Sequence, residues 1–403
     1  MVTSDLDQYF HPKCENWIGY KPCPKQKAQG LPHCDTCDQY SMLKERVEPH
    51  LPSVIFNPEL LRSAQSIGIV EMGGLGSILR TSAVVKAIRE RNSTASIYWF
   101  SHEAGVELVR YIPGITPIHI MTEFDLQIDV LINFEINPLV KKLIRTATSV
   151  AGFTLNEVGQ FEPASVHATE LQRLQIDDTF RRENTKSMQQ ILLNTIGLSK
   201  STPHYFIELT QQNEVNANLL CEKYGIPSNK DKTVIGLNIG TSKKGKLKRW
   251  PVRNFVEVAR LLQEAYPNAH FCFFSGPEDE ELRTPLTEYI SNVQGISFSN
   301  LNGLEVGDFM AMVGKMSMMV TADTFGMHAS FMQQIPTIVL AGPMPSKEIE
   351  ASKQDRIITA DFPCAPCYYR CRRQILGECM EIITPLEVTA IAQGMLGLTQ
   401  TSE

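Results

Sequence analysis

Short apolar runs alternate with helix-like stretches from about residue 66 onward. The runs SIGIVEM (66–72), SIYWFS (96–101) and IDVLINFE (128–135) have the length and composition of buried strands. Residues 77–92 follow the first run and carry apolar positions at helical spacing. This alternation predicts a parallel sheet with helices on both of its faces.

A second series of the same kind begins at TVIGLNIG (233–240) and continues through three further apolar runs, at 270–276, 318–323 and 337–342. The segment 157–205 between the two series is more polar and mostly helical in pattern, so it is interpreted as the end of the first domain and a connector. A final helix is expected to begin near residue 384.

The pattern therefore predicts an α/β protein with two Rossmann-like, doubly wound domains that face a cleft, at 51–205 and 206–403. A cysteine-rich arm, 1–50, precedes them and lacks either periodicity. Ligands of such sheets bind at the carboxyl ends of the strands, so the loops there are the first places to look for chemistry.

Composition narrows the class of protein. The 403 residues are 43% hydrophobic and 20% charged, with a net charge of −6, which is typical of a globular protein and gives no basic excess for nucleic acid. The N-terminus lacks a signal-peptide pattern, and no apolar run reaches the ~20 residues needed to span a bilayer. We expect a cytoplasmic protein, where clustered cysteines favour metal over disulfides.

Three loops that follow predicted strands carry candidate chemistry. The first, EMGGLGSILRTS (71–82), has glycines that allow a sharp turn into a helix, although many α/β proteins use such a turn for packing alone. The second, NIGTSKKGKLKRWP (238–251), offers Thr241 and Ser242 and then five cations, Lys243, Lys244, Lys246, Lys248 and Arg249. Such a cluster suits a phosphate, and the alternative is a solvated basic loop.

The third loop is TADTFGMHASF (321–331). Asp323 and Thr324 end a strand, and His328 lies one helical turn further on. Asp323 is either the N-cap of the following helix or part of a site for the phosphates and sugar of a nucleotide, and the sequence leaves both open.

Together, these loops resemble glycosyltransferase family 9, the ADP-heptose:lipopolysaccharide heptosyltransferases and their relatives. The similarity extends over about residues 66–395 and rests on the order of K-x-W-P (248–251) before D-T-x-x-x-H (323–328). The resemblance implies a GT-B fold and inverting transfer of heptose or a similar sugar from a nucleoside-diphosphate donor. The implied acceptor is a glycolipid or a protein, as in lipopolysaccharide biosynthesis or protein glycosylation, and it would bind the N-terminal domain.

The resemblance also implies which residues would act. Lys248 would stabilise the leaving diphosphate, and the donor would be lined by Gly240, Thr241, Ser242, Lys248, Arg249, Gly276, Asp323, Thr324, Gly326 and His328. The only Asp-x-Asp, Asp5–Asp7, lies in the terminal arm, so no metal is expected for the transfer itself. Contact with the inner face of a membrane and oligomerisation are both compatible with this assignment.

Two positions depart from the family pattern. The first loop of the family usually has an Asp that acts as the base, whereas here the position is Ser77, which is too weak a base near neutral pH. Glu71, at the end of the same strand, is a candidate replacement or a structural carboxylate. Phe325 stands where the family has glycine, with Gly326 after it, so the donor pocket is expected to differ.

Eight of the ten cysteines form two compact sets. Cys364, Cys367, Cys371 and Cys379 form a finger at 364–379, and Cys14, Cys23, Cys34 and Cys37 lie in the arm. Both spacings are typical of four-thiolate structural sites for zinc, iron or an iron–sulfur cluster, and the alternative is unrelated buried thiols. Relatives in the family also carry such a finger. Cys221 and Cys272 are expected in the core.

Two other functions remain open from the sequence. One is a redox or sensor protein built around an iron–sulfur cluster. The other is a catalytically inactive relative that binds a nucleotide sugar, which the serine at position 77 suggests.

Overall fold

The computed structural model describes Cys14 and residues 52–156, 159–228, 232–369, 371 and 375–400. The predicted arm at 1–50, with Cys23, Cys34 and Cys37, therefore lies outside the described residues apart from Cys14. By its contacts the chain divides into two compact units, with the boundary between Phe206 and Ile207 and with Gly74–Leu79 grouped with the second unit.

The first unit is built on a six-stranded sheet with the order β3-β2-β1-β4-β5-β6. All neighbouring strands are parallel except β5 and β6, which are antiparallel. The strands are β1 (Ser66–Val70), β2 (Ser96–Ser101), β3 (Ile115–His119), β4 (Val130–Asn133), β5 (Ser149–Leu155) and β6 (Phe161–Pro163). Every residue of β4 is buried, as the continuous apolar run predicted.

Four of the helical segments described in this unit, α4, η3, α7 and α8, begin at a side chain that caps them. Asp177 accepts hydrogen bonds from the amides of Thr179 and Phe180, and Ser187 accepts one from Gln190. The helix expected at 77–92 is α3, which begins two residues earlier. The helices are α2 (Leu60–Ser63), α3 (Leu75–Arg89), α4 (Glu103–Val109), η3 (Pro138–Val140), α5 (Lys141–Thr146), η4 (Val166–Ala168), α6 (Thr169–Ile176), α7 (Asp178–Glu183) and α8 (Met188–Thr195).

The second unit contains a fully parallel six-stranded sheet with the order β12-β11-β10-β7-β8-β9. The prediction of two doubly wound α/β sheets is thus confirmed. The strands are β7 (Val234–Asn238), β8 (His270–Ser275), β9 (Phe298–Asn302), β10 (Met318–Ala322), β11 (Thr337–Ala341) and β12 (Arg356–Thr359).

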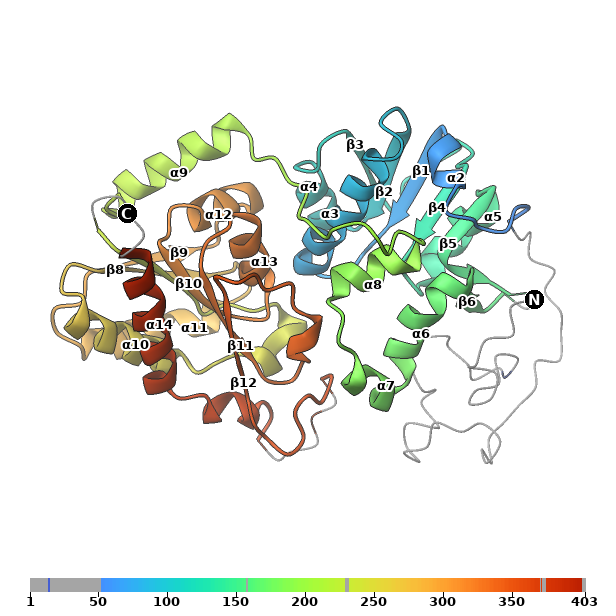
Figure 1. Cartoon of the computed structure of the whole chain (residues 1–403). Helices are drawn as coiled ribbons and strands as arrows, with labels where there is room; N and C mark the ends of the chain where they lie inside the picture. Colours follow the sequence, from blue (N-terminus) through green and yellow to red (C-terminus); the bar gives the residue numbers. More distant parts are fainter. Residues whose placement is uncertain are drawn as a thin grey trace. The chain divides into compact units, whose positions relative to one another are not determined.

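Helices cover both faces of this second sheet. In Figure 1, α9, α12 and α13 lie on one side of it, and α10, α11 and α14 lie on the other. Trp250 is buried against Phe255 of α10, with their rings nearly perpendicular at 79°. The helices are α9 (Gln211–Tyr224), η5 (Lys243–Lys248), α10 (Val252–Ala265), α11 (Glu280–Ser291), α12 (Val306–Val313), α13 (Phe325–Met332), η6 (Ser346–Glu348), η7 (Glu378–Ile382) and α14 (Pro385–Gln400).

Each sheet reverses its strand order beside its own first strand. β1 lies between β2 and β4, and β7 lies between β8 and β10. The loops that leave β1 and β4, or β7 and β10, therefore lead to opposite faces and leave a crevice at the carboxyl edge, where ligands of such sheets bind.

Among the described residues, no helix is both long enough and apolar enough to cross a bilayer.

Candidate functional site

Glu71 follows β1 directly and is held at the carboxyl edge of the first sheet. Its backbone carbonyl accepts hydrogen bonds from Ser101 Oγ at 2.8 Å and from Trp99 Nε1 at 3.4 Å. Its Oε1 accepts from the Gly73 amide at 2.7 Å, and the residue is 8% exposed. The carboxyl group therefore lies in a fixed, poorly solvated position.

A second carboxylate, Glu135, lies two residues after the neighbouring strand β4. Its Oε1 accepts from the Met72 amide at 2.6 Å, and Asn133 fixes its backbone through both its own amide nitrogen and its oxygen. The pKa of Glu71 is raised to about 8, first by burial and then by the nearby Glu135 charge. The Gly73 amide and the Arg80 guanidinium act in the opposite direction.

Glu71 also lines a pocket of about 190 Å³ within the first unit. One wall of this pocket is apolar, and the other lining residues can form hydrogen bonds or carry charge. The apolar residues are Phe134, Leu171, Leu174, Met188 and Leu192, and the polar ones are Glu71, Arg80, Gln175 and Arg181. Ser77, the residue at the family's usual base position, lies in the first turn of α3, where its amide donates to the Gly74 carbonyl at 2.8 Å.

The second unit places a partly buried ion pair at the corresponding edge of its sheet. Lys248 Nζ, at the end of η5, donates to Asp323 Oδ2 at 2.8 Å and to the Asp323 carbonyl at 2.7 Å. Asp323 follows β10, so the pair connects the loops after β7 and β10. Burial acts to lower the pKa of Lys248, but Asp323 and Tyr369 raise it, and the net shift is upward. Lys248 therefore stays cationic.

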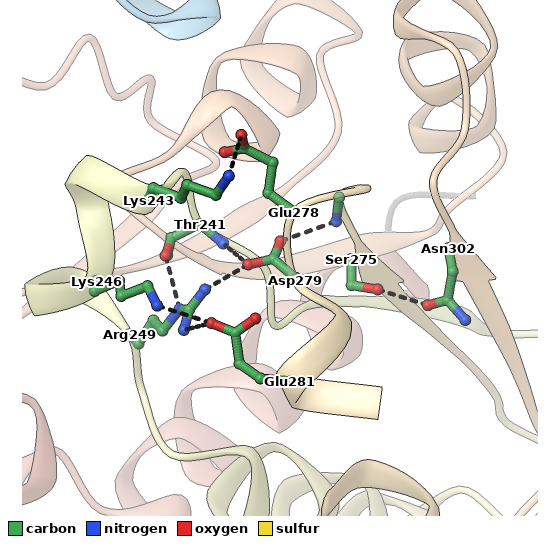
Figure 2. A network of polar contacts seen from close by, with 10 residues as sticks. Thr241, Lys243, Lys246, Arg249, Ser275, Glu278, Asp279, Glu281 and Asn302 are labelled. Carbon is green, nitrogen blue, oxygen red and sulfur yellow. Dashed lines mark hydrogen bonds and ion pairs between the residues drawn. The ribbon is translucent and has the colours of Figure 1, made fainter. Parts of the chain in front are cut away.

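The loop after β7 is also connected to the loop after β8 (Figure 2). Asp279, which is 2% exposed, accepts hydrogen bonds from the amides of Thr241 at 3.2 Å and Gly276 at 2.9 Å. Arg249 donates to Asp279 at 2.7 Å and to Thr241 Oγ1 at 2.9 Å. A single buried carboxylate thus fixes the backbone of both loops.

The acidic residues after β8 neutralise most of the basic cluster that the sequence singled out. Lys243 pairs with Glu278 at 3.3 Å, and Lys246 pairs with Glu281 at 3.0 Å. Hydrogen bonds from Arg249 and Lys246 lower the pKa of Glu281 to about 2. Four of the five predicted phosphate-binding cations are ion-paired within the protein, and the Lys244 side chain lies outside the described part.

The third predicted loop lies beside the first two. Asn238, at the end of β7, donates to Thr324 Oγ1 and to Thr321 Oγ1, both at 2.9 Å. A Cβ on Gly326 would approach Asn238 Nδ2 to 2.6 Å, so a residue without a side chain is needed at this contact. Thr324, not Asp323, is the N-cap of α13, and Asp323 instead pairs with Lys248. His328 is buried in α13, with Nδ1 at 3.9 Å from Glu350 Oε2.

The finger cysteines influence one another electrostatically. Burial raises the pKa of Cys379 to about 11, with further contributions from Cys367, Cys364 and Cys371. These thiols are free, and across the described part of the chain no three or more His, Cys, Asp or Glu side chains form a group arranged to hold a metal. Cys272 is fully buried in β8 and Cys221 is half-buried in α9. In the arm, only Cys14 is described, and its carbonyl accepts from Gln160 Nε2 at 2.8 Å.

Sequence reasoning missed Glu135 and Asp279. Glu135 had a usable signal, because IDVLINFE ends on a glutamate after a strand just as SIGIVEM does. Asp279 stands in the acidic run after SG at 275–276, whose charge is complementary to the basic loop. The sequence thus marks each carboxylate as following a strand, whereas the contacts of each are recognised only once the neighbouring strands are known.

The raised pKa of Glu71 predicts a pH-dependent stability. Because the folded pKa of about 8 lies above the ordinary value of 4.5, the folded protein keeps a proton that the unfolded chain releases between these values. The stabilisation that comes from protonated Glu71 is therefore complete below pH ~4.5 and is lost as pH rises through about 8. Between these values the free energy of unfolding falls by at most about 1.4 kcal/mol per pH unit. Glu71→Gln should remove this loss.

Denaturant unfolding at about pH 6 and about pH 8.5 measures the effect. The exposed Glu107→Gln is the control and should keep the wild-type pH dependence. An identical pH dependence in wild type and Glu71→Gln would contradict the prediction.

Comparisons with known proteins were made for sequence and for fold. The sequence profile of "Glycosyltransferase family 9 (heptosyltransferase)" matches residues 164–375. No curated protein sequence matches the chain significantly. A glycosyl transferase of family 9 from Veillonella parvula is 16% identical, with a TM-score of 0.64, over 82% of this chain and 97% of that one.

Two proteins of Escherichia coli are similar in fold. ADP-heptose lps heptosyltransferase II is 16% identical, with a TM-score of 0.58, over 83% of this chain and 99% of that one. The iron-containing dodecameric glycosyltransferase TibC is 11% identical, with a TM-score of 0.52, over 89% of this chain and 79% of that one. The fold is therefore GT-B, as expected. Because the family profile matches more than half of its residues, the chain belongs to glycosyltransferase family 9, the heptosyltransferase family, and is a glycosyltransferase.

Proposed function

We propose that the protein transfers a sugar, heptose or a similar one, from a nucleoside-diphosphate donor to an acceptor hydroxyl with inversion. The observation that carries this proposal is Lys248, a partly buried, ion-paired cation at the point where the second sheet reverses its strand order. A leaving diphosphate gains negative charge in the transition state, and a fixed cation in a poorly solvated site stabilises that charge strongly. ADP-heptose is the donor class suggested by the similarity in fold to an ADP-heptose lps heptosyltransferase.

The donor would bind across the loops after β7 and β10. Lys248, Thr241 and Ser242 would hold its phosphates, while Thr324, Gly326 and His328 at the start of α13 would line the sugar side. Asp323 would keep Lys248 in place. Arg249, together with Gly240 and Gly276, would act mainly by fixing the loop through Asp279. The cations that could neutralise the diphosphate are protein side chains, so the transfer requires no metal.

Glu71 would be the general base. In the reaction, the acceptor oxygen bonds to the anomeric carbon, the bond from that carbon to the phosphate oxygen breaks, and the acceptor proton passes to Glu71. A carboxyl with a pKa of about 8 is a far stronger base than an ordinary glutamate, and its pKa is close to neutral pH. The pocket that it lines supplies apolar surface and two guanidinium groups for an acceptor.

The proposal also covers the acceptor, the location and the oligomeric state of the protein. The acceptor would be a glycolipid or a protein, and no nucleic acid is expected with a net charge of −6. A glycolipid acceptor would place the enzyme in the cytoplasm at the inner face of a membrane. The dodecameric state of TibC motivates a test for an oligomer.

The four finger cysteines would hold a structural metal, either iron or zinc. Support comes from their spacing, from the electrostatic influence of three of these thiols on Cys379, and from the iron-containing TibC, which is similar in fold. Four-thiolate sites are closed, so this metal would stabilise the segment and would take no part in transfer.

A panel of nucleotides tests the donor site directly. Lys248→Ala should weaken binding of ADP about tenfold or more, because a charge-assisted hydrogen bond to phosphate is lost. Isothermal titration calorimetry with ADP, UDP and GDP measures the affinities, and transfer from the matching nucleotide sugar then identifies the donor. The exposed Lys223→Ala on α9 is the matched control. An unchanged ADP affinity in Lys248→Ala would overturn the assignment.

The role of Glu71 predicts a particular pH–rate profile. Turnover should rise with pH towards an apparent pKa near 8, because only the deprotonated carboxylate accepts the proton. Glu71→Gln should lower kcat about a hundredfold or more while changing donor affinity less than about twofold. Glu135→Gln should shift the profile to lower pH, since a like charge is removed. Near-normal turnover of Glu71→Gln would show that another group takes the proton.

The metal proposal is tested by elemental analysis of protein purified without oxygen. At least about one equivalent of iron or zinc per chain is expected, and a second if the arm cysteines also bind. Replacing Cys364 and Cys379 with serine should remove one equivalent, whereas Cys221→Ser should keep the wild-type content. Less than one equivalent in the wild type would refute the proposal.

A further inference from the structure

Lys248 has a partner outside the two loops discussed above. Its Nζ lies 5.3 Å from the centre of the Tyr369 ring, and Tyr369 acts to raise the pKa of Lys248. Tyr369 belongs to the cysteine-rich finger, between Cys367 and Cys371. The finger therefore reaches the ion pair that the proposed donor site depends on.

The backbone of the finger is shaped to present this ring. Tyr368 and Tyr369 both have left-handed backbone angles, with φ of 51° and 63°, which residues other than glycine rarely adopt. Tyr368 is buried, and its amide donates to the Pro343 carbonyl at 2.8 Å. With Tyr368 anchored after β11, the next residue is turned towards Lys248.

The finger and the residues that follow it also hold the loop that carries Lys248. Trp250 Nε1 donates to the Ile383 carbonyl at 2.9 Å, and Arg253 pairs with Glu381. Gly377 packs against the backbone of Leu247, where an added Cβ would approach the Leu247 carbonyl oxygen to 3.3 Å. These contacts flank Lys248 on both sides in sequence.

The hydrogen bonds of Lys248 leave room for a phosphate. An ammonium group has three N–H donors, and Asp323 accepts two of them through its carboxylate and its carbonyl. A phosphate oxygen is a charged acceptor and forms a strong hydrogen bond with an ammonium group. A donor phosphate can therefore accept the third N–H while the Tyr369 ring remains against the ammonium group.

We propose that Tyr369 is a positioning residue for Lys248: its ring holds the ammonium group in place so that one N–H can be donated to a phosphate of the donor. Through Tyr369, the finger at 364–379 would set the affinity of the enzyme for nucleoside diphosphates. This inference rests on the proposed role of Lys248 as a phosphate ligand. It makes no use of a bound metal.

Two substitutions separate the ring from the hydroxyl. Tyr369→Ala should weaken ADP binding about three- to tenfold, in line with the loss of a cation–π contact. Tyr369→Phe removes the hydroxyl and keeps the ring, so its ADP affinity should equal that of the wild type. Tyr289→Ala, at a partly exposed position on α11, is the matched control. Calorimetry with ADP measures all four proteins.

A double-mutant cycle tests whether Tyr369 acts through Lys248. The Lys248→Ala, Tyr369→Ala double variant should bind ADP as weakly as Lys248→Ala alone, and additive losses would overturn the proposal. So would a wild-type affinity in Tyr369→Ala, or an equal loss in Tyr369→Phe. If Lys248→Ala itself binds ADP normally, the proposed donor site fails as well. If Lys248→Ala weakens ADP binding but the Tyr369 variants bind ADP normally, the proposed donor site is supported and the role of Tyr369 is refuted. Should thermal unfolding show that Tyr369→Ala does not fold, Tyr369→Leu replaces it with the same expected outcomes.

Discussion

The reversal of strand order beside the first strand of each sheet is the constraint on which the sites depend. β1 and β4 in the first sheet, and β7 and β10 in the second, are parallel neighbours whose following loops diverge to opposite faces. Polar side chains that follow these strands therefore meet in places that the apolar strands themselves shield from solvent. In the first sheet these side chains are Glu71 and Glu135, and in the second they are Lys248 and Asp323.

Partial shielding from solvent has opposite results in the two pairs: one keeps a neutral carboxyl group and the other keeps a charged ammonium group. Burial, together with the like charge of Glu135, keeps a proton on Glu71, which makes Glu71 a stronger base. A lysine with a carboxylate instead keeps its charge where burial alone would favour losing it. The first arrangement suits the acceptance of a proton, and the second suits a departing anion. These are the two charge changes that the proposed transfer requires.

Much of the fold could be predicted from the sequence, because buried parallel strands appear as continuous apolar runs. The edge strand β3 was not singled out, because all five of its residues remain partly or fully exposed and it contains Pro117. The order of the loops identified Lys248 and Asp323 as candidates. These two residues are 75 positions apart in sequence, and they meet because β7 and β10 are neighbours in the sheet. Tyr369 had no signal of its own, since its direction is set by two unusual backbone angles.

The buried carboxylate of Asp279 also limits which sequences this site can adopt. Its oxygens accept from two backbone amides, so no other side chain of different length can make the same contacts. A Cβ on Gly240 would lie only 2.3 Å from Asp279 Oδ2 and 3.1 Å from the Gly276 amide nitrogen. Anyone who diversifies this loop to change the donor sugar should therefore leave positions 240 and 279 unaltered. A variable position of such a library is one whose side chain is exposed, such as Lys243, which can be exchanged without disturbing the buried carboxylate.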